Sequence, residues 1–177
     1  MDPVRRYAPS RRALHWLMFL GVVLAFVFIE GREWFERGTP ARLAMVQAHF
    51  WVGIVLLALM LPRLLLAFSR PAPAVLPPLP AWQALPAKAV HLLLYAMLIV
   101  QPLLGLGTAW TDGKEILLPF TQVALPALLA PDATLAGKLE ELHEWVGTTF
   151  YYVVGLHAAA ALYHHFVRRD DTLRRMA

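Results

Sequence analysis

The chain has 177 residues, of which 59% are hydrophobic and only 16% are charged, and its mean hydropathy is +0.54. Soluble domains carry about 25% charged residues, so this composition indicates an integral membrane protein. The chain contains no cysteine, which excludes disulfides, thiolate metal sites, iron–sulfur clusters and covalent haem attachment through C-x-x-C-H. The basic pI does not indicate nucleic-acid binding, because the basic residues flank the apolar segments, where a membrane topology signal also places them.

Four apolar segments approach or exceed the length of about 20 residues that a bilayer core requires. They predict a single all-α membrane domain with helices at about residues 13–30, 43–68, 87–110 and 138–167. Pro62 lies inside the second segment and is expected to kink that helix or to mark its practical end. The proline-rich stretch from Arg70 to Pro86 predicts an extended linker, and residues 111–137 predict a surface-lying loop with short helical turns.

The distribution of basic residues predicts the orientation of these helices. Four spans place both termini on the same side of the membrane. The termini and the connection between the second and third spans carry eleven of the sixteen lysines and arginines, and the other two connections carry five. The positive-inside rule therefore predicts that both termini are cytoplasmic.

Two histidines of the last helix, His143 and His157, are fourteen positions apart. At 100° and 1.5 Å per residue, both imidazoles leave the same helix face about 21 Å apart along the axis. The predicted orientation places His49 at the depth of His143, near the outer side, and His15 at the depth of His157, nearer the cytoplasm. Facing histidines in a helix bundle can hold a cofactor, and two imidazoles fill both axial positions of a haem. Three of these histidines have a small residue four positions later, on the same face, which leaves room for a flat macrocycle: Gly53, Gly147 and Ala161.

Spacing alone leaves the inner pair open. His164 lies seven residues after His157 on nearly the same face, so it competes with His157 as the partner of His15. His165 faces about 100° away. His91, at the start of the third helix, has no spare partner at its depth, which indicates an interface histidine or a substrate contact.

Motifs from three of the helices and from the tail carry a family resemblance. They are L-H-W (14–16), A-H-F-W-V-G-I (48–54), H-E-W-V-G (143–147) and V-V-G-L-H-A-A-A-A-L-Y-H-H-F-V-R-R-D-D-T-L-R-R-M (153–176). Together they resemble the bacterial cytochrome b561 family. The resemblance implies a transmembrane four-helix bundle of the inner membrane with two haem b groups in its core. The haem iron ligands it implies are His15, His49, His143 and His157, which decides against His164 as a ligand.

The resemblance also implies an electron-transfer function. One type of this family oxidises superoxide on the periplasmic side and passes the electron through the haems to ubiquinone. A quinone-contacting histidine of that type falls on His164, and no residue is assigned as catalytic. The outer loops, with five basic and nine acidic residues, would steer an anionic donor poorly, although Arg32, Arg37 and Arg42 form a local basic cluster.

Two other functions remain open at this point. The chain could be the haem b subunit of a larger membrane dehydrogenase or hydrogenase that receives electrons from a periplasmic redox partner. It could also be a small transporter that uses histidine relays, although inverted repeats and broken half-helices are not evident. A soluble metalloenzyme is excluded, because Gly147 replaces the second histidine of H-E-x-x-H in H-E-W-V-G.

Overall fold

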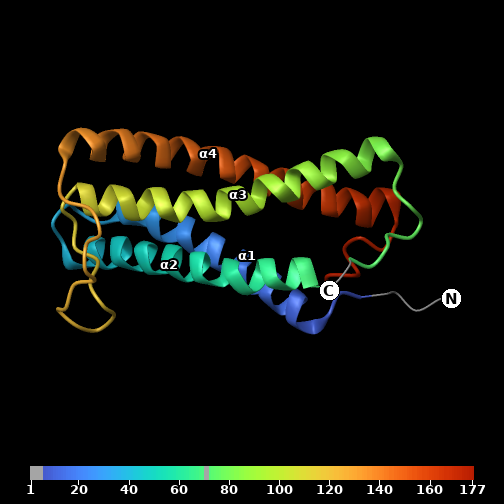
Figure 1. The fold of residues 1–177 in the computed structure, drawn as a ribbon, viewed down its shortest axis with the longest axis horizontal. Helices are drawn as coiled ribbons and strands as arrows, with labels where there is room; N and C mark the ends of the chain where they lie inside the picture. Colours follow the sequence, from blue (N-terminus) through green and yellow to red (C-terminus); the bar gives the residue numbers. More distant parts are fainter. Residues whose placement is uncertain (1–5, 70–71) are drawn as a thin grey trace.

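The computed structural model describes residues 6–69 and 72–177. Four long helices make up most of it (Figure 1): α1 (Pro9–Gly31), α2 (Pro40–Ser69), α3 (Ala81–Thr111) and α4 (Ala133–Tyr163). A 3₁₀ turn (Arg32–Trp34) follows α1, and a π-helical turn (His164–Arg168) extends α4. Within the described residues the only β pairing is one isolated bridge, so the predicted all-α class is confirmed. Arg5 and Arg70, which the charge count includes, lie outside the described residues.

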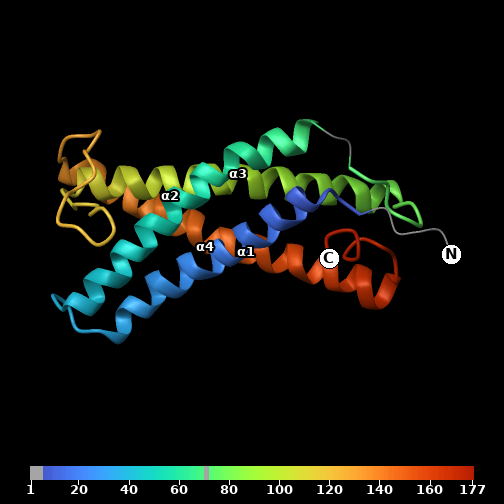
Figure 2. The same cartoon turned by 90° about the horizontal axis from the view of Figure 1, so that it is seen from below.

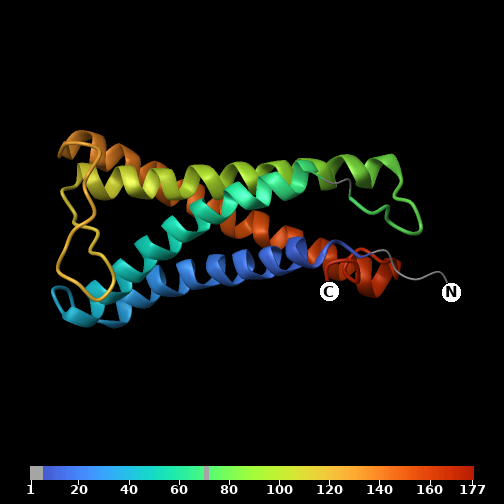
Figure 3. The same cartoon turned by 60° about the horizontal axis from the view of Figure 1, so that its bottom comes forward.

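The chain runs up and down through the bundle. α1 packs against α2, α3 packs against α4, and α2 also contacts α3. Figures 2 and 3 show α2 leaning from α1 towards α3 along its length. Both ends of the described chain and the connection after α2 lie at one end of the bundle, called the inner end below (Figure 1). The two other connections lie at the opposite, outer end.

Three of the helical segments are long and apolar enough to cross a membrane: Pro9–Trp34, Pro40–Ser69 and Ala81–Thr111. Their best windows have a mean hydropathy of 1.9 to 2.2, and few of the window residues are buried inside the protein. α4 is as long as α3 and lies along it (Figure 1). Threonines, tyrosines and histidines interrupt its apolar part, which lowers its hydropathy. Three membrane-spanning candidates are therefore established, and a fourth span in α4 stays a prediction.

The helices begin earlier than the hydropathy pattern predicts. Pro9 and Pro40 are the first residues of α1 and α2, where a fixed φ is pre-organised and the missing N–H costs nothing. α4 begins after Asp132, whose Oδ1 accepts hydrogen bonds from the backbone N–H of Thr134 at 2.9 Å and of Leu135 at 3.0 Å. Each of these three helices begins before its predicted apolar segment. The first turn of a helix can be polar and capped outside the membrane core, and a hydropathy pattern does not include it.

Prolines end fewer elements than predicted. The sequence predicts a linker that reaches Pro86, yet α3 already begins at Ala81 and contains Pro86. Likewise, α2 continues beyond Pro62 to Ser69, so Pro62 does not mark the end of the helix. A proline removes only one hydrogen bond from the ladder, and neighbouring structure can satisfy the freed carbonyl. Proline content alone therefore overestimates the length of the linker.

The connection between α3 and α4 forms a small hairpin and not the predicted helical turns. Leu117 and Ala124 make an antiparallel bridge. The N–H of Leu118 donates to the carbonyl of Val123 at 2.8 Å, and the N–H of Leu125 donates to that of Ile116 at 2.7 Å. These bonds pair part of the backbone of a loop that is apolar in composition and lies at the outer end of the bundle (Figure 1).

The apolar core occupies the middle of the bundle. It consists of buried residues from all four helices: Met18, Val22, Leu56, Met60, Met97, Val146 and Phe150. On α4, the two core residues lie between His143 and His157 in sequence. The core therefore separates the outer from the inner histidines with apolar side chains.

Candidate functional site

The outer histidine pair joins α2 to α4. The ring centroids of His49 and His143 are 6.2 Å apart, and the ring planes are at 87°. The Nδ1 of His49 lies 2.9 Å from the carbonyl oxygen of Ala25, and the Nδ1 of His143 lies 3.1 Å from that of Gln101. When Nδ1–H donates to a backbone carbonyl, the lone pair is on Nε2, which is the arrangement of most metal-ligating histidines.

The inner pair joins α1 to α4. The ring centroids of His15 and His157 are also 6.2 Å apart, with the planes at 67°. A metal midway between two imidazoles places their centroids about 6.3 Å apart, because each metal–nitrogen bond is about 2 Å. Both pairs match this spacing. The structure thus brings the four predicted ligands together as two pairs, at opposite ends of the apolar core.

His91 lies beside the inner pair, although the sequence offered it no partner at its depth. Its ring centroid is 5.2 Å from that of His157, with the planes at 86°, and its Nδ1 is 2.5 Å from the carbonyl oxygen of Ala87. At that separation His91 and His157 are about 1 Å too close to share a metal. The geometry therefore favours His15 as the partner of His157, with His91 as a third imidazole against it.

Two residues of α3 shape the outer pair, and the sequence did not single them out. A Cβ at Gly105 would lie 2.9 Å from Cε1 of His143, so only glycine leaves room for this ring. Gln101 donates from Nε2 to the backbone carbonyl of His143 at 2.9 Å, and the same nitrogen is 3.3 Å from the ring Nε2. Its Oε1 is buried without a hydrogen-bond partner among the described residues. A polar residue inside an apolar span is usually functional, and that signal could have identified Gln101.

The small residues predicted to leave space have different neighbours. A Cβ at Gly147 would lie 2.8 Å from Nε2 of Gln101, so this glycine makes room for the glutamine. A Cβ at Gly53 would meet Pro102 at 3.8 Å, which is ordinary packing. Gly105 and Gly147 together define how closely α3 and α4 approach at the outer pair. Two imidazoles whose Nδ1 atoms face backbone carbonyls are a donor set that fits an iron porphyrin.

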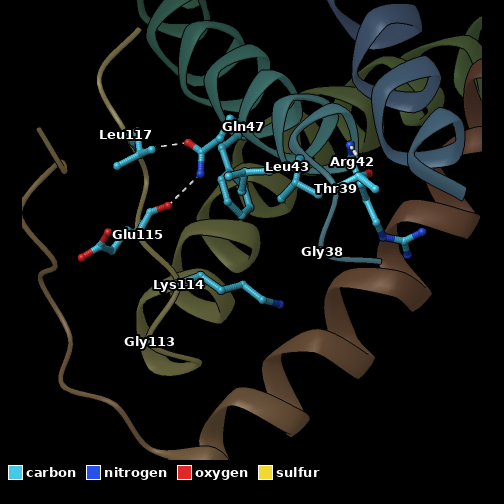
Figure 4. A pocket seen from close by; sticks show the side chains of 11 residues that line it. Gly38, Thr39, Arg42, Leu43, Gln47, Gly113, Lys114, Glu115 and Leu117 are labelled. Carbon is cyan, nitrogen blue, oxygen red and sulfur yellow. Dashed lines mark hydrogen bonds between the residues drawn. The ribbon is translucent and has the colours of Figure 1, made fainter. Parts of the chain in front are cut away.

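A hollow of about 620 Å³ lies at the outer end, between the start of α2 and the loop after α3 (Figure 4). Gln47 holds the loop in place: its Nε2 donates to the carbonyl of Glu115 at 2.8 Å, and its Oε1 accepts from the N–H of Leu117 at 2.9 Å. Phe50 lines this hollow, and its ring centroid is 6.4 Å from that of His49. Neither histidine pair lines the hollow itself.

Acidic neighbours balance the basic cluster beside this hollow. Arg42 makes an ion pair of 2.7 Å with Glu33, and Arg32 makes one of 2.9 Å with the same carboxylate oxygen. Arg42 also donates to the backbone carbonyls of Arg32 and Phe35, both at 3.0 Å. These arginines therefore fix the turn between α1 and α2, and their charge at the outer surface is partly compensated.

The π-helical turn at the inner end carries His164. Its Nδ1 is 2.6 Å from Oδ2 of Asp170, and Nε of Arg168 is 2.9 Å from the same oxygen. The Asp170 side chain is fully buried. Burial raises the pKa of this carboxyl, but hydrogen bonds from His164 and Thr172 outweigh it and hold the pKa below its usual range. The inner end therefore contains an imidazole, His164, that contacts a buried carboxylate, Asp170.

The sequence did not predict a role for Asp170, although the R-R-D-D run of the tail places acids where arginines dominate. The other tail histidine, His165, packs its ring on Phe166 with 4.7 Å between centroids. Its Nδ1 is buried without a hydrogen-bond partner in residues 6–69 and 72–177. Of the two adjacent histidines, His164 is the one that contacts an acid among the described residues.

An all-helical bundle with long apolar helices and facing histidine pairs has the architecture of a membrane cytochrome. The family model described as prokaryotic cytochrome b561 matches residues 6–177. The chain therefore belongs to the prokaryotic cytochrome b561 family, whose members are membrane electron carriers that bind haem b.

Known relatives match along almost their whole length. The chain is 31% identical over 173 residues to "Cytochrome b561 homolog 1" of Escherichia coli K12, covering 98% of this chain and 97% of the relative. It is 32% identical over 178 positions to the "Probable superoxide oxidase CybB" of Yersinia pestis, covering 97% and 96%. "Cytochrome b561 homolog 2" of E. coli K12 is 31% identical over 180 positions, covering 97% and 90%.

Proposed function

We propose that the chain transfers electrons across the bacterial inner membrane, from superoxide on the periplasmic side to ubiquinone on the cytoplasmic side. In this proposal His49 and His143 hold an outer haem b, and His15 and His157 hold an inner one. The observation that carries it is the presence of two histidine pairs with the same centroid separation of 6.2 Å, one on each side of the apolar core. A relative named as a probable superoxide oxidase supports the choice of donor.

A haem held by two imidazoles exchanges single electrons and has no open coordination position. The chain supplies the geometry around it. The carbonyls of Ala25 and Gln101 fix the imidazoles of His49 and His143, which orients both rings before the cofactor binds. Buried methionine, valine, leucine and phenylalanine side chains fill the middle of the bundle, so the interior between the two pairs stays dry.

The donor side fits the outer hollow. Its wall includes Phe50, whose ring centroid is 6.4 Å from that of His49, so a small donor in the hollow would lie near the outer pair. Lys114 and Arg42 also line the hollow. Their positive charges favour a small anion locally, although Asp112 and Glu33 are paired with them, so the steering is weak.

The acceptor side fits the inner end. His164 lies seven residues beyond His157, about 10 Å further along the helix axis, where a quinone headgroup could receive a hydrogen bond from an imidazole. The reaction balances when two superoxide anions each lose one electron to give O₂, and ubiquinone takes up two electrons and two protons to give ubiquinol.

The decisive experiment is stopped-flow spectroscopy of the purified protein. A pyridine haemochrome assay first counts the haems, and two per chain are expected. Superoxide should then reduce the haems of the isolated chain, and ubiquinone should reoxidise them. One haem or none would contradict the two sites. Reduction that requires a co-purifying protein partner would instead indicate a subunit of a larger dehydrogenase or hydrogenase.

A further inference from the structure

We infer that Asp170 is a positioning residue of the quinone site: it fixes the His164 imidazole so that Nε2 faces a quinone carbonyl oxygen. The inference rests on the proposed function, because it deepens the acceptor site of that reaction. It starts from the contact between Nδ1 of His164 and Oδ2 of Asp170 at 2.6 Å. A carboxylate in this place accepts the Nδ1–H, so only Nε2 remains to meet a substrate.

The backbone is built to make this contact. The helix widens into a π turn at His164–Arg168 and ends in a left-handed residue, Arg169, with φ of 58°. The chain then reverses, and the N–H of Asp170 donates to the carbonyl of His164 at 3.1 Å. A non-glycine residue at positive φ is uncommon, and π turns occur frequently at functional sites. The unusual backbone thus returns the carboxylate to a ring only six residues earlier.

The carboxylate is in turn held in place. Its Oδ1 accepts the N–H of Thr172 at 2.9 Å, and its Oδ2 faces Nε of Arg168 at 2.9 Å. Arg168 donates to Oε1 of Gln83 at 2.6 Å and to the carbonyl of Pro78 at 2.9 Å. The contacts therefore connect His164 to the start of α3 and to the proline-rich connection. The orientation of the imidazole thus depends on contacts between the tail and residues 85 to 90 positions earlier in the chain.

The chemistry gives Asp170 a defined task. The doubly protonated His164 gives its Nε2–H proton to the quinone oxygen that it faces, and water at the inner end then reprotonates the ring; the opposite quinone oxygen takes its proton from water. With the two electrons of the proposed function, ubiquinone becomes ubiquinol. Asp170 stays ionised throughout and compensates the charge of the ring when both nitrogens carry protons, as the buried aspartate does for the histidine of a catalytic triad.

A purely structural role is the competing explanation, and the chain offers a matched control for it. Asp171 is also buried, with an exposed fraction of 8%. Its Oδ1 accepts the N–H of Leu76 at 2.9 Å and lies 3.6 Å from Nε of Arg175. Asp171 thus fastens the same tail to the same connection, and no contact between it and His164 is seen in the described residues. If Asp170 only holds the tail, the two aspartates should behave alike.

The test measures reoxidation of the pre-reduced, haem-loaded protein by a short-chain ubiquinone in anaerobic stopped flow, over a range of quinone concentrations. Asp170→Asn is expected to lower the saturating rate at least about tenfold, within the range of proton-transfer catalysis, with haem content and reduction by superoxide unchanged. Asp171→Asn should stay within about twofold of the wild type. In the His164→Asn background, Asp170→Asn should add no further loss, because the two residues act as one unit.

Four outcomes would overturn the inference. Asp171→Asn could slow reoxidation as much as Asp170→Asn, or Asp170→Asn could retain its full effect without His164. A wild-type rate in His164→Asn would place the quinone elsewhere while leaving the proposed function intact, whereas a wild-type protein that ubiquinone does not reoxidise would refute that function itself.

If Asp170→Asn loses its haems, the double variant Asp170→Asn/Arg168→Gln removes both charges of the buried pair. It is compared with Arg168→Gln alone, and equal rates of the two would also overturn the inference.

Discussion

Gly105 gives the sharpest test of the outer site, because its lack of a side chain is what admits the His143 ring. In Gly105→Ala the new Cβ would lie 2.9 Å from Cε1 of His143. Carbon–carbon contacts are optimal at about 3.5–4.0 Å, so the ring would have to retreat by roughly 0.6–1 Å. Its Nδ1 is already 3.1 Å from the carbonyl of Gln101, and that hydrogen bond would be stretched or lost. Loss of such a bond lowers metal affinity by about 10–100-fold.

The assay is titration of the haem-free protein with haemin, followed by the pyridine haemochrome count on the purified variant. We expect Gly105→Ala to bind the inner haem with normal affinity and the outer haem about 10 to 100 times more weakly. Gly137→Ala is the matched control, because a Cβ there has no neighbour within 4 Å and the residue lies on the same helix as His143. Two tightly bound haems in Gly105→Ala would refute His143 as a ligand held in this orientation.

Replacing His49 with alanine should remove only the outer haem and replacing His15 only the inner one, each leaving one haem per chain with a single reduction potential in a redox titration. Asp132→Ala should lower the free energy of unfolding by about 0.5–2 kcal/mol through loss of the α4 cap. Asp112→Ala, which breaks only an exposed ion pair, should cost at most about 1 kcal/mol in the same denaturation measurement. The lowered pKa of Asp170 stabilises the docked tail above the unfolded-chain value of about 3.9, and this stabilisation is lost as the pH falls through the folded value. Pepsin should therefore cleave the tail faster as the pH drops below about 4 in the wild type, with a weaker pH dependence in Asp170→Asn.

Helical periodicity and the charge distribution predicted the outer histidine pair, left the partner of His15 open between His157 and His164, and did not indicate which groups hold the rings. The fourteen-residue spacing of His143 and His157 placed both rings on one face, and the charge distribution then ordered them by depth. The supporting groups come from another helix: Gln101 and Gly105 act on His143 from α3. A contact between helices depends on the relative rotation and translation of both, which no pattern within one helix encodes. His91 illustrates the same limit, because only the packing of α3 against α4 brings it to His157.

The tail marks a second limit of sequence reasoning. Its arginines were counted as a topology signal, and that count treats each charge as independent of its neighbours. In the structure Arg168 and Arg175 face the buried aspartates 170 and 171. The π turn and the left-handed Arg169 that make these contacts possible have no reliable sequence signature. A tail with neighbouring pairs of basic and acidic residues is therefore compatible with a solvent-exposed C-terminus and with a C-terminus that folds back and is buried.

The low hydropathy of α4 is explained by the functional residues that this helix carries. It provides one histidine to each pair, His143 to α2 and His157 to α1, and it continues into the turn that carries His164. Glycines and polar side chains at these positions lower its hydropathy below that of the other three helices, so it is not among the apolar membrane-spanning candidates. A helix that only had to cross the bilayer could be uniformly apolar. In a bundle with two histidine pairs, the helix shared by both pairs is expected to be the least apolar, and low hydropathy there indicates the functional helix and not a soluble one.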